Sequence, residues 1–224
     1  ISPKLLTKAN MIFKDPRYSF RHLNKAELEK YTEDFRTIYN KAWGSHSGVN
    51  TIDQRQARAI MKQLKPVMDE KVLWFGYFED QPIAFFLMIP ELNQSFKYLS
   101  GGFNLARKLQ FLWVHKVQKL NRKLLGLVFG VVPEFQGKGV DGGIIESFRR
   151  FINDKGGYDR YDYLEMNWIG DFNPKMMIVV EQVGADIVKT HHTYRKLFDE
   201  TKPFKRMPIV GAKPDSQKDK EGDN

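Results

Sequence analysis

The apolar positions in the first third of the chain change from strand spacing to helix spacing. Residues 18–23 alternate apolar and polar side chains, which is typical of a strand with one buried face. Over residues 28–43 the apolar side chains recur every three or four positions, which predicts an amphipathic helix. Asn24 and Glu27 have the spacing of a capping box in front of that helix. A second stripe predicts another helix over residues 57–64.

The rest of the chain continues the alternation of strands and helices. Two aromatic and β-branched runs separated by a short polar turn predict an antiparallel hairpin over 72–78 and 83–89. We expect a less regular insertion near 90–121 that contains one helix. The further elements are a buried strand at 124–132, a helix face at 144–152, a strand at 161–169, a helix at 173–182, and one or two strands at 185–197. This order predicts an α/β fold with a central mixed β-sheet flanked by helices.

The polar ends of the chain set the expected domain limits. Residues 1–16 show no sustained periodicity and are interpreted as a lead-in or linker, whereas 17–200 form a single domain. Residues 201–224 are rich in Lys, Asp, Gly and Ser, which predicts a disordered tail. The chain starts with Ile1 rather than methionine, so we expect a piece of a longer protein.

The amino-acid composition excludes several kinds of functional site. The 224 residues contain no cysteine, which excludes disulfides, thiolate metal sites and a cysteine nucleophile. The five histidines are scattered, and the adjacent pair His191-His192 would point to opposite faces of a strand, so no metal site is expected. Without a signal peptide or an apolar run long enough to span a bilayer, we expect a cytoplasmic protein with no integral membrane segment.

The net charge of +9 is unevenly distributed. Residues 92–133 contain no acid and seven basic side chains, together with aromatic residues. Three interpretations stay open for this stretch: solvated charge around a helix docked on the sheet, a site for an anionic acceptor or the phosphates of a coenzyme, and a membrane or nucleic-acid surface. Because the rest of the chain has a net charge of only +2, the total charge alone does not predict a nucleic-acid partner.

A glycine-rich loop between the strand at 124–132 and the following helix carries the most specific signal. Successive backbone N–H groups in such a loop, together with the positive end of a helix, can bind a phosphate or pyrophosphate. Lys138 adds a charge at the same place. A flexible turn between two packed elements is the alternative interpretation. The loop lacks the Ser or Thr that follows Gly-Lys in a Walker motif, and its strand does not open a βαβ unit.

Residues 131–140, with the sequence Val-Val-Pro-Glu-Phe-Gln-Gly-Lys-Gly-Val, resemble the Gln/Arg-x-x-Gly-x-Gly/Ala loop of the GNAT superfamily of acyl-coenzyme A-dependent N-acyltransferases. Asn173 and Gly184 resemble a second motif of that family, and the element order matches over most of the chain. The stretches 139–141, 165–169 and 185–190 look like the carboxy-terminal domain of a poorly characterised group of larger bacterial GNAT-like proteins. The resemblance implies the GNAT fold and transfer of an acyl group from acetyl-coenzyme A, or another acyl-coenzyme A, to an amine. It also implies an upstream domain.

The resemblance assigns coenzyme contacts to a short list of residues. Backbone groups of Val131 and Val132 would bond the pantetheine arm, and the loop and first helical turn would hold the pyrophosphate. These candidate cofactor-binding residues are Val131, Val132, Gln136, Gly137, Lys138, Gly139, Val140, Asp141, Gly142 and Asn173. Asp141 stands where the family usually has Gly or Ala, and is either a helix N-cap or a charge that weakens coenzyme binding. Val180 stands where many members have a tyrosine that protonates the departing thiolate.

Glu165 and Tyr194 are the candidate catalytic residues. An amine must lose a proton before it attacks a thioester, and Glu165, an acid within an otherwise apolar strand, is the candidate base. A structural carboxylate bonded to arginine or to backbone is the other interpretation. Tyr194 could replace the missing acid, or it could pack on the core. A backbone N–H at Val131 or Val132 would stabilise the oxyanion.

The sequence therefore favours an N-acyltransferase with an unknown amine acceptor. The alternative is a catalytically inactive GNAT-fold module, which the two departures at Asp141 and Val180 motivate.

Overall fold

The structure is a computed structural model that describes residues 1–44, 49–99, 101–102, 104–153, 157–204 and 206–210. It consists of two compact units, one formed by residues 5–167 and the other by residues 1–4 together with 168–224. Each unit is described by itself below. Residues 205 and 211–224 of the predicted polar tail lie outside the described residues. None of the helices in the described ranges is long and apolar enough to cross a membrane.

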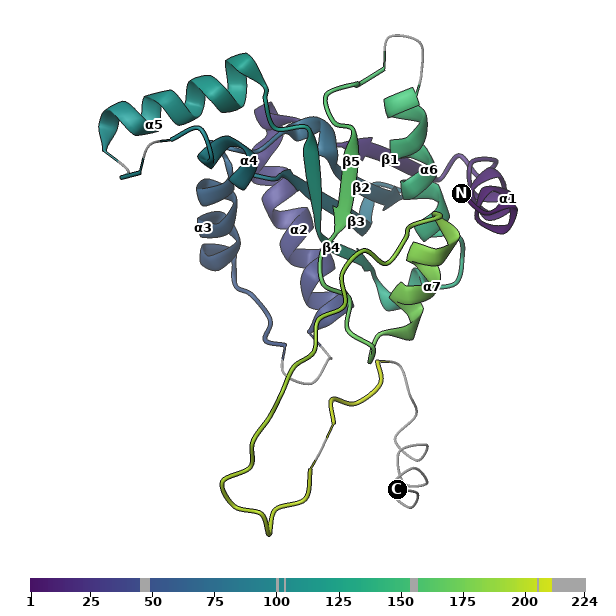
Figure 1. Cartoon of the computed structure of the whole chain (residues 1–224). Coiled ribbons are helices and arrows are strands. Elements are labelled where there is room, and N and C mark those ends of the chain that lie inside the picture. The colour runs from purple at the N-terminus through teal and green to yellow at the C-terminus, as the bar shows by residue number, and fades with distance from the viewer. Residues whose placement is uncertain (45–48, 100, 103, 154–156, 205, 211–224) are drawn as a thin grey trace. The chain divides into compact units, whose positions relative to one another are not determined.

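A five-stranded mixed sheet is the centre of the unit 5–167 (Figure 1). Its strands lie in the order in which they occur along the chain. The first four pair antiparallel and the last two are parallel. They are β1 (Tyr18–His22), β2 (Leu73–Phe78), β3 (Gln81–Pro90), β4 (Lys123–Val131) and β5 (Tyr163–Met166). The predicted hairpin is confirmed, and Glu79 and Asp80 form its turn with positive φ angles.

Helices connect and flank the strands (Figure 1). They are α1 (Pro3–Ile12), α2 (Leu28–Trp43), α3 (Gln54–Leu64), α4 (Asn93–Phe96), α5 (Leu105–Leu112) and α6 (Val140–Asn153), whereas α7 (Pro174–Gln182) belongs to the other unit. A π-helical segment, Trp113–Gln118, continues α5, so the described helix of the predicted insertion covers residues 105–118. Shorter 3₁₀ turns occur at Lys25–Glu27, Glu70–Val72 and Pro133–Phe135.

The core has two layers because successive side chains of β2 and β3 point to opposite faces of the sheet. On one face α2 packs against the sheet through ring contacts of Tyr31 with Phe75 and of Phe35 with Phe85. On the other face the ring of Phe148 in α6 contacts those of Trp74 and Phe86. The alternating burial of the strands is therefore satisfied by one helix on each side, which makes the fold a mixed sheet flanked by helices.

Two predictions near the amino terminus are wrong. Residues 3–12 form a helix instead of an irregular lead-in, and Leu5, Ala9 and Ile12 are buried at three- and four-residue spacing. Asn24 does not cap α2: its side chain accepts the N–H of Ala26 at the start of a 3₁₀ turn. A capping box exists instead at α3, where Asp53 and Gln56 bond each other's backbone N–H groups.

The second unit contains α7, and a bond from the Ser2 N–H to the Gln182 carbonyl joins its two chain segments at 2.7 Å. The predicted strands at 185–197 are wrong, because none of these residues enters a sheet. The apolar side chains of Ile187 and Val188 are exposed there. A segment with alternating apolar positions forms a strand only when a neighbouring strand supplies hydrogen bonds and the apolar side chains have a core to pack on.

Candidate functional site

Strand β4 has one extra residue relative to β3 within their paired region. Val128 pairs with Leu87 of β3 and Gly126 pairs with Met88, so Leu127 has no partner in β3 and forms a bulge. On the other side, β5 pairs with β4 only over residues 123–126. The Asn167 N–H makes the last bond, to the Gly126 carbonyl. Among the described strands of this unit, none pairs with the outer edge of β4 beyond the bulge.

The backbone of Val131 faces that outer edge. The Val132 N–H donates to the Ile83 carbonyl of β3 at 2.9 Å, and neighbouring residues of a strand direct their backbone groups to opposite sides. The Val131 carbonyl accepts a bond from the Gln136 side-chain amide at 3.1 Å. The expectation that the Val132 N–H could serve as an oxyanion donor is therefore wrong, because the sheet already uses this group. Val131 is the residue of this pair whose backbone is directed outward.

The loop after β4 has a backbone geometry that favours glycine at two positions. Gly137 and Gly139 have φ angles of 75° and 87°, in the left-handed region that other residues rarely adopt. Helix α6 begins at Val140. The hydrogen bond at its amino end joins the Gly143 N–H to the Gly139 carbonyl at 2.9 Å. The N–H groups of residues 140–142 consequently have no acceptor within the helix. The Lys138 N–H donates weakly to the Phe135 carbonyl at 3.4 Å, so the N–H groups at the helix start are the main candidate donors for a phosphate.

The charged side chains at this loop have definite places. Lys138 lies with its Nζ 5.0 Å from the centre of the Phe135 ring, so its charge stays at the loop. Asp141 is the second residue of α6 and not its N-cap, which corrects that interpretation of the sequence. A carboxylate in the first turn is stabilised by the helix dipole, and it adds negative charge beside the N–H groups just described.

Helix α1 packs directly against the glycines at the start of α6. A Cβ atom added at Gly142 would lie 3.2 Å from the Leu5 carbonyl oxygen, and one at Gly143 would lie 2.5 Å from the Phe20 ring and 3.0 Å from Ile12. The backbone of α1 also approaches the loop, with the Lys8 carbonyl oxygen 3.3 Å from the corresponding position at Gly139. The sequence analysis missed this contact, although a Gly-Gly pair within a helical pattern is a signal for close approach.

Glu165 lies on β5, opposite Leu125 of β4. Its carboxylate forms an ion pair with Lys123, and both side chains are about one quarter exposed. Leu125 and Val131 are six positions apart on β4, which corresponds to about 20 Å along an extended strand. Glu165 is thus at the end of the open edge that is remote from the glycine loop, close to the point where β4 and β5 separate. The sequence offered no signal for its lysine partner.

Two other candidate residues belong to the second unit. The Asn173 side chain accepts the Met176 N–H at 3.2 Å and is the N-cap of α7. Tyr194 lies in the segment without regular structure and is 91% exposed within the described chain. The structure brings the residues from Val131 to Gly142 together in one continuous strand, loop and helix start. The roles of Asn173, Glu165 and Tyr194 stay predictions.

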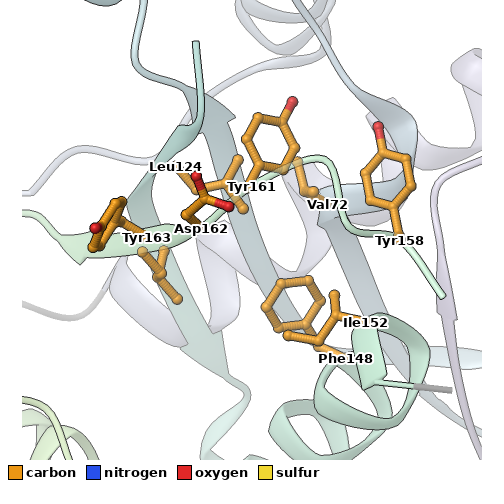
Figure 2. Close-up of a pocket in the computed structure, with 9 residues that line it drawn as sticks. Val72, Leu124, Phe148, Ile152, Tyr158, Tyr161, Asp162 and Tyr163 are labelled. Atoms are coloured by element: carbon orange, nitrogen blue, oxygen red, sulfur yellow. The ribbon is translucent and has the colours of Figure 1, made fainter. Parts of the chain in front are cut away.

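A small cavity of about 200 Å³ lies on the α6 face of the sheet (Figure 2). Phe148 and Ile152 line it from α6, and Leu124 lines it from β4. The hydroxyls of Tyr158 and Tyr161 both bond to the Asp69 carboxylate. Burial is the main cause that raises the pKa of both phenols, and the nearby acid raises it further. Since Phe148 and Ile152 are in the last two turns of α6, the cavity is remote from the glycine loop at its start. Among the described residues no group of three or more metal-ligand side chains occurs.

The chain is similar to two curated bacterial proteins. It is 25% identical over 181 residues to a bacterial ceramide synthase of Caulobacter vibrioides, a match that covers 78% of this chain and 46% of that protein. It is 24% identical over 180 residues to Protein YghO of Escherichia coli, with 80% and 46% covered. The chain thus spans about half the length of the curated relatives that it matches. No family model matches it.

Solved structures with similar folds include acetyltransferases. One is an aminoglycoside acetyltransferase from an uncultured soil metagenomic sample in complex with trehalose, with a TM-score of 0.51 at 10% identity, covering 82% of this chain and 98% of that one. The same enzyme in complex with sisomicin gives a TM-score of 0.50 at 9% identity, covering 81% and 97%. Together with the sheet order, the bulge and the glycine loop, this likeness shows that the chain has the fold of the GNAT acetyltransferases.

Proposed function

We propose that this chain is an acyl-coenzyme A-dependent N-acyltransferase. The observation that carries the proposal is the open outer edge of β4, which runs from the bulge at Leu127 to a loop with two positive-φ glycines and the start of α6. An extended pantetheine arm could pair with the backbone of Val131 as an added strand. The N–H groups from Gly137 to Gly142 would then hold the pyrophosphate, and Lys138 would add a compensating charge.

The reaction needs one proton acceptor and one proton donor. The amine gives up a proton, its nitrogen attacks the thioester carbonyl, and the tetrahedral intermediate expels the coenzyme as a thiolate that then takes a proton. Glu165 would accept the amine's proton, which requires its ion pair with Lys123 to open or exchange. Tyr194 is the proposed donor to the thiolate, and Asn173 a further contact of the coenzyme.

The similarity to a ceramide synthase suggests the class of acceptor. A ceramide is an N-acylated long-chain amino alcohol, so we propose a long-chain primary amine as acceptor and a fatty acyl-coenzyme A as donor. Nothing in the residues of the loop depends on the length of the acyl chain, because the loop would contact only the coenzyme.

A thiol-release assay tests this proposal. The full chain is incubated with acetyl- or palmitoyl-coenzyme A and with a panel of amines that includes sphinganine, a short primary amine and an aminoglycoside. We expect free thiol and the N-acyl product with sphinganine, and loss of this activity in Glu165→Gln. The matched control is Glu181→Gln, an acid of α7 that is not among the proposed site residues. No thiol release with any donor and acceptor would contradict the enzyme proposal.

A GNAT-fold module without turnover is the second candidate, and Asp141 and Val180 favour it. A thermal-shift titration with coenzyme A separates the two. If the coenzyme at about 100 times a micromolar Kd adds about 2.7 kcal/mol of stability while no product forms, the site binds without catalysis. If it adds nothing, the loop is a structural turn only.

A further inference from the structure

Helix α5 and its π-helical continuation expose a stripe of large apolar side chains. Leu105, Leu109, Trp113 and Val117 follow one another at four-residue spacing and are 73%, 60%, 58% and 56% exposed. The wider π-helical turn keeps Val117 on the same side as Trp113, because it has more residues per turn than an α-helix. We call these four residues the apolar stripe. Leu120 and Tyr98, whose carbonyl accepts a bond from the Gln110 side chain, are also exposed.

The opposite side of the same helix is fixed to the fold. The Phe111 ring stacks on Phe96 at 5.0 Å and on the His115 imidazole at 5.5 Å. Asn121 is fully buried and its side-chain amide contacts His115 Nδ1 at 3.2 Å. The Arg160 guanidinium donates to the backbone and side-chain oxygens of Asn121. The helix is thus anchored on one side, and Figure 1 shows α5 extending away from the sheet of its unit.

Basic side chains accompany the stripe without any acid. Residues 92–120 contain five lysines and arginines and no aspartate or glutamate. They are Lys97, Arg107, Lys108, Lys116 and Lys119. Lys108 and Lys116 flank the apolar stripe at helical spacing, and both are exposed. Contiguous exposed apolar side chains are uncommon on a soluble surface and mark an interaction site.

We infer that residues 93–120 dock on the surface of an anionic lipid bilayer, with the apolar stripe inserted at the level of the headgroups and the basic residues against lipid phosphates. A helix with Leu and Trp on one side and Lys and Arg around it lies in the plane of a membrane interface. Trp113, with its amphipathic indole, is suited to that depth. The attraction of the five cations is lipid-specific, because it requires anionic headgroups.

Two other occupants fit this surface less well. A nucleic acid would use the cations but leave three exposed aliphatic side chains in contact with nothing, because its bases stack on aromatic groups. A second copy packed through the same stripe would bring two sets of five cations together with no acid in this segment to pair with them. A bilayer accepts both the apolar side chains and the cations.

Vesicle co-sedimentation of the full chain tests the inference. Phosphatidylcholine vesicles with and without phosphatidylglycerol are compared at about 0.1 M and about 0.5 M salt. We expect binding to the anionic vesicles at low salt, and at least about tenfold weaker binding for Leu109→Glu/Trp113→Glu. Lys108→Gln/Lys116→Gln should weaken binding to anionic vesicles only. Met11→Glu, which adds a charge at another exposed apolar helical position, is the matched control and should bind like the wild type.

Several outcomes would overturn the inference. Equal binding by wild type and the Leu109/Trp113 variant would show that the stripe is not inserted. Binding to an RNA homopolymer that survives in this variant, without binding to vesicles, would favour a polyanion site. A dimer that the variant abolishes, without vesicle binding, would favour a second copy. Because no acyl transfer enters this assay, the docking surface and the proposed enzyme can fail separately.

Discussion

Two neighbouring stretches of the chain, the α4–α5 segment (residues 93–120) and the β4–α6 segment (residues 123–153), differ in what they offer to a binding partner. The first offers side chains, and the second offers backbone groups. In the β4–α6 segment, glycines allow other backbone to approach closely, and the candidate binding groups are backbone N–H donors. In the α4–α5 segment one helix side is anchored, and the other presents large apolar and basic side chains. A site made of backbone depends on tight packing, whereas a docking surface depends on side chains that packing leaves uncovered.

The strongest test of the comparison is Gly143→Ala. Alanine is the better helix former by about 1 kcal/mol, but its Cβ would lie 2.5 Å from the Phe20 ring, so α1 or β1 must shift. We expect a net loss of about 2 kcal/mol in the free energy of unfolding, measured by urea denaturation. Gly126→Ala is the control, because its Cβ would have ordinary contacts beginning at 3.6 Å. Equal stability of both variants would mean that Phe20 and Ile12 do not pack against Gly143 as described.

The second test compares two glycines with similar backbones. Gly137 and Gly102 have φ angles of 75° and 70°, and a Cβ would meet no atom within 4 Å at either. Alanine should therefore cost each about 1 kcal/mol of folding stability. We expect the affinity for coenzyme A, measured by calorimetry, to weaken about tenfold in Gly137→Ala only. If both variants bind alike, the loop is not the pyrophosphate site.

The third test concerns the anchor of α5. Burial is the main cause that lowers the pKa of His115, with further contributions from Arg160 and Lys116. Folding therefore favours the neutral imidazole, whereas the unfolded chain binds a proton near pH 6.5. Stability from this site is complete above that pH and is lost as the pH falls toward the lower pKa of the folded state. We expect a loss of the order of one buried hydrogen bond, about 1 kcal/mol.

The measurement for His115 is urea denaturation at several pH values from about 7.5 to about 5, the range in which histidine side chains usually gain a proton. His115→Gln should flatten the dependence on pH below neutrality. The matched control is His192→Gln, an exposed histidine of the second unit, which should leave that dependence unchanged. A wild-type stability that does not change with pH would show that the ring is not held in its neutral form.

The smallest expected effect belongs to Asp141→Asn. Asp141 is in the first turn of α6, beside the N–H groups proposed to hold phosphate. Removing its charge should strengthen coenzyme A binding about threefold at low salt, with the gain shrinking as salt increases. The helix should lose a few tenths of a kcal/mol, about the worth of a carboxylate near an N-terminus. Weaker binding would instead indicate that the carboxylate contacts the coenzyme's ribose or adenine.

Much of the unit 5–167 could be predicted from local pattern. The hairpin β2–β3, the helices α2, α3 and α6, and the strand β4 have strong periodicity, because each buries one continuous face. The predictions failed where a partner decides the conformation. The lead-in became helix α1 because Leu5, Ala9 and Ile12 find buried places, and residues 185–197 form no strand in the absence of a ladder partner.

The sequence by itself determined the glycine loop, because glycine adopts the φ angles at Gly137 and Gly139 far more readily than other residues, and this preference is local. It also determined that residues 92–120 combine apolar and basic side chains. Only the tertiary structure decided which backbone groups are used and which face outward: the Val132 N–H bonds β3, Glu165 meets Lys123, and the apolar stripe stays exposed while Phe111 is buried. These outcomes depend on residues distant in sequence, so no local pattern contains them.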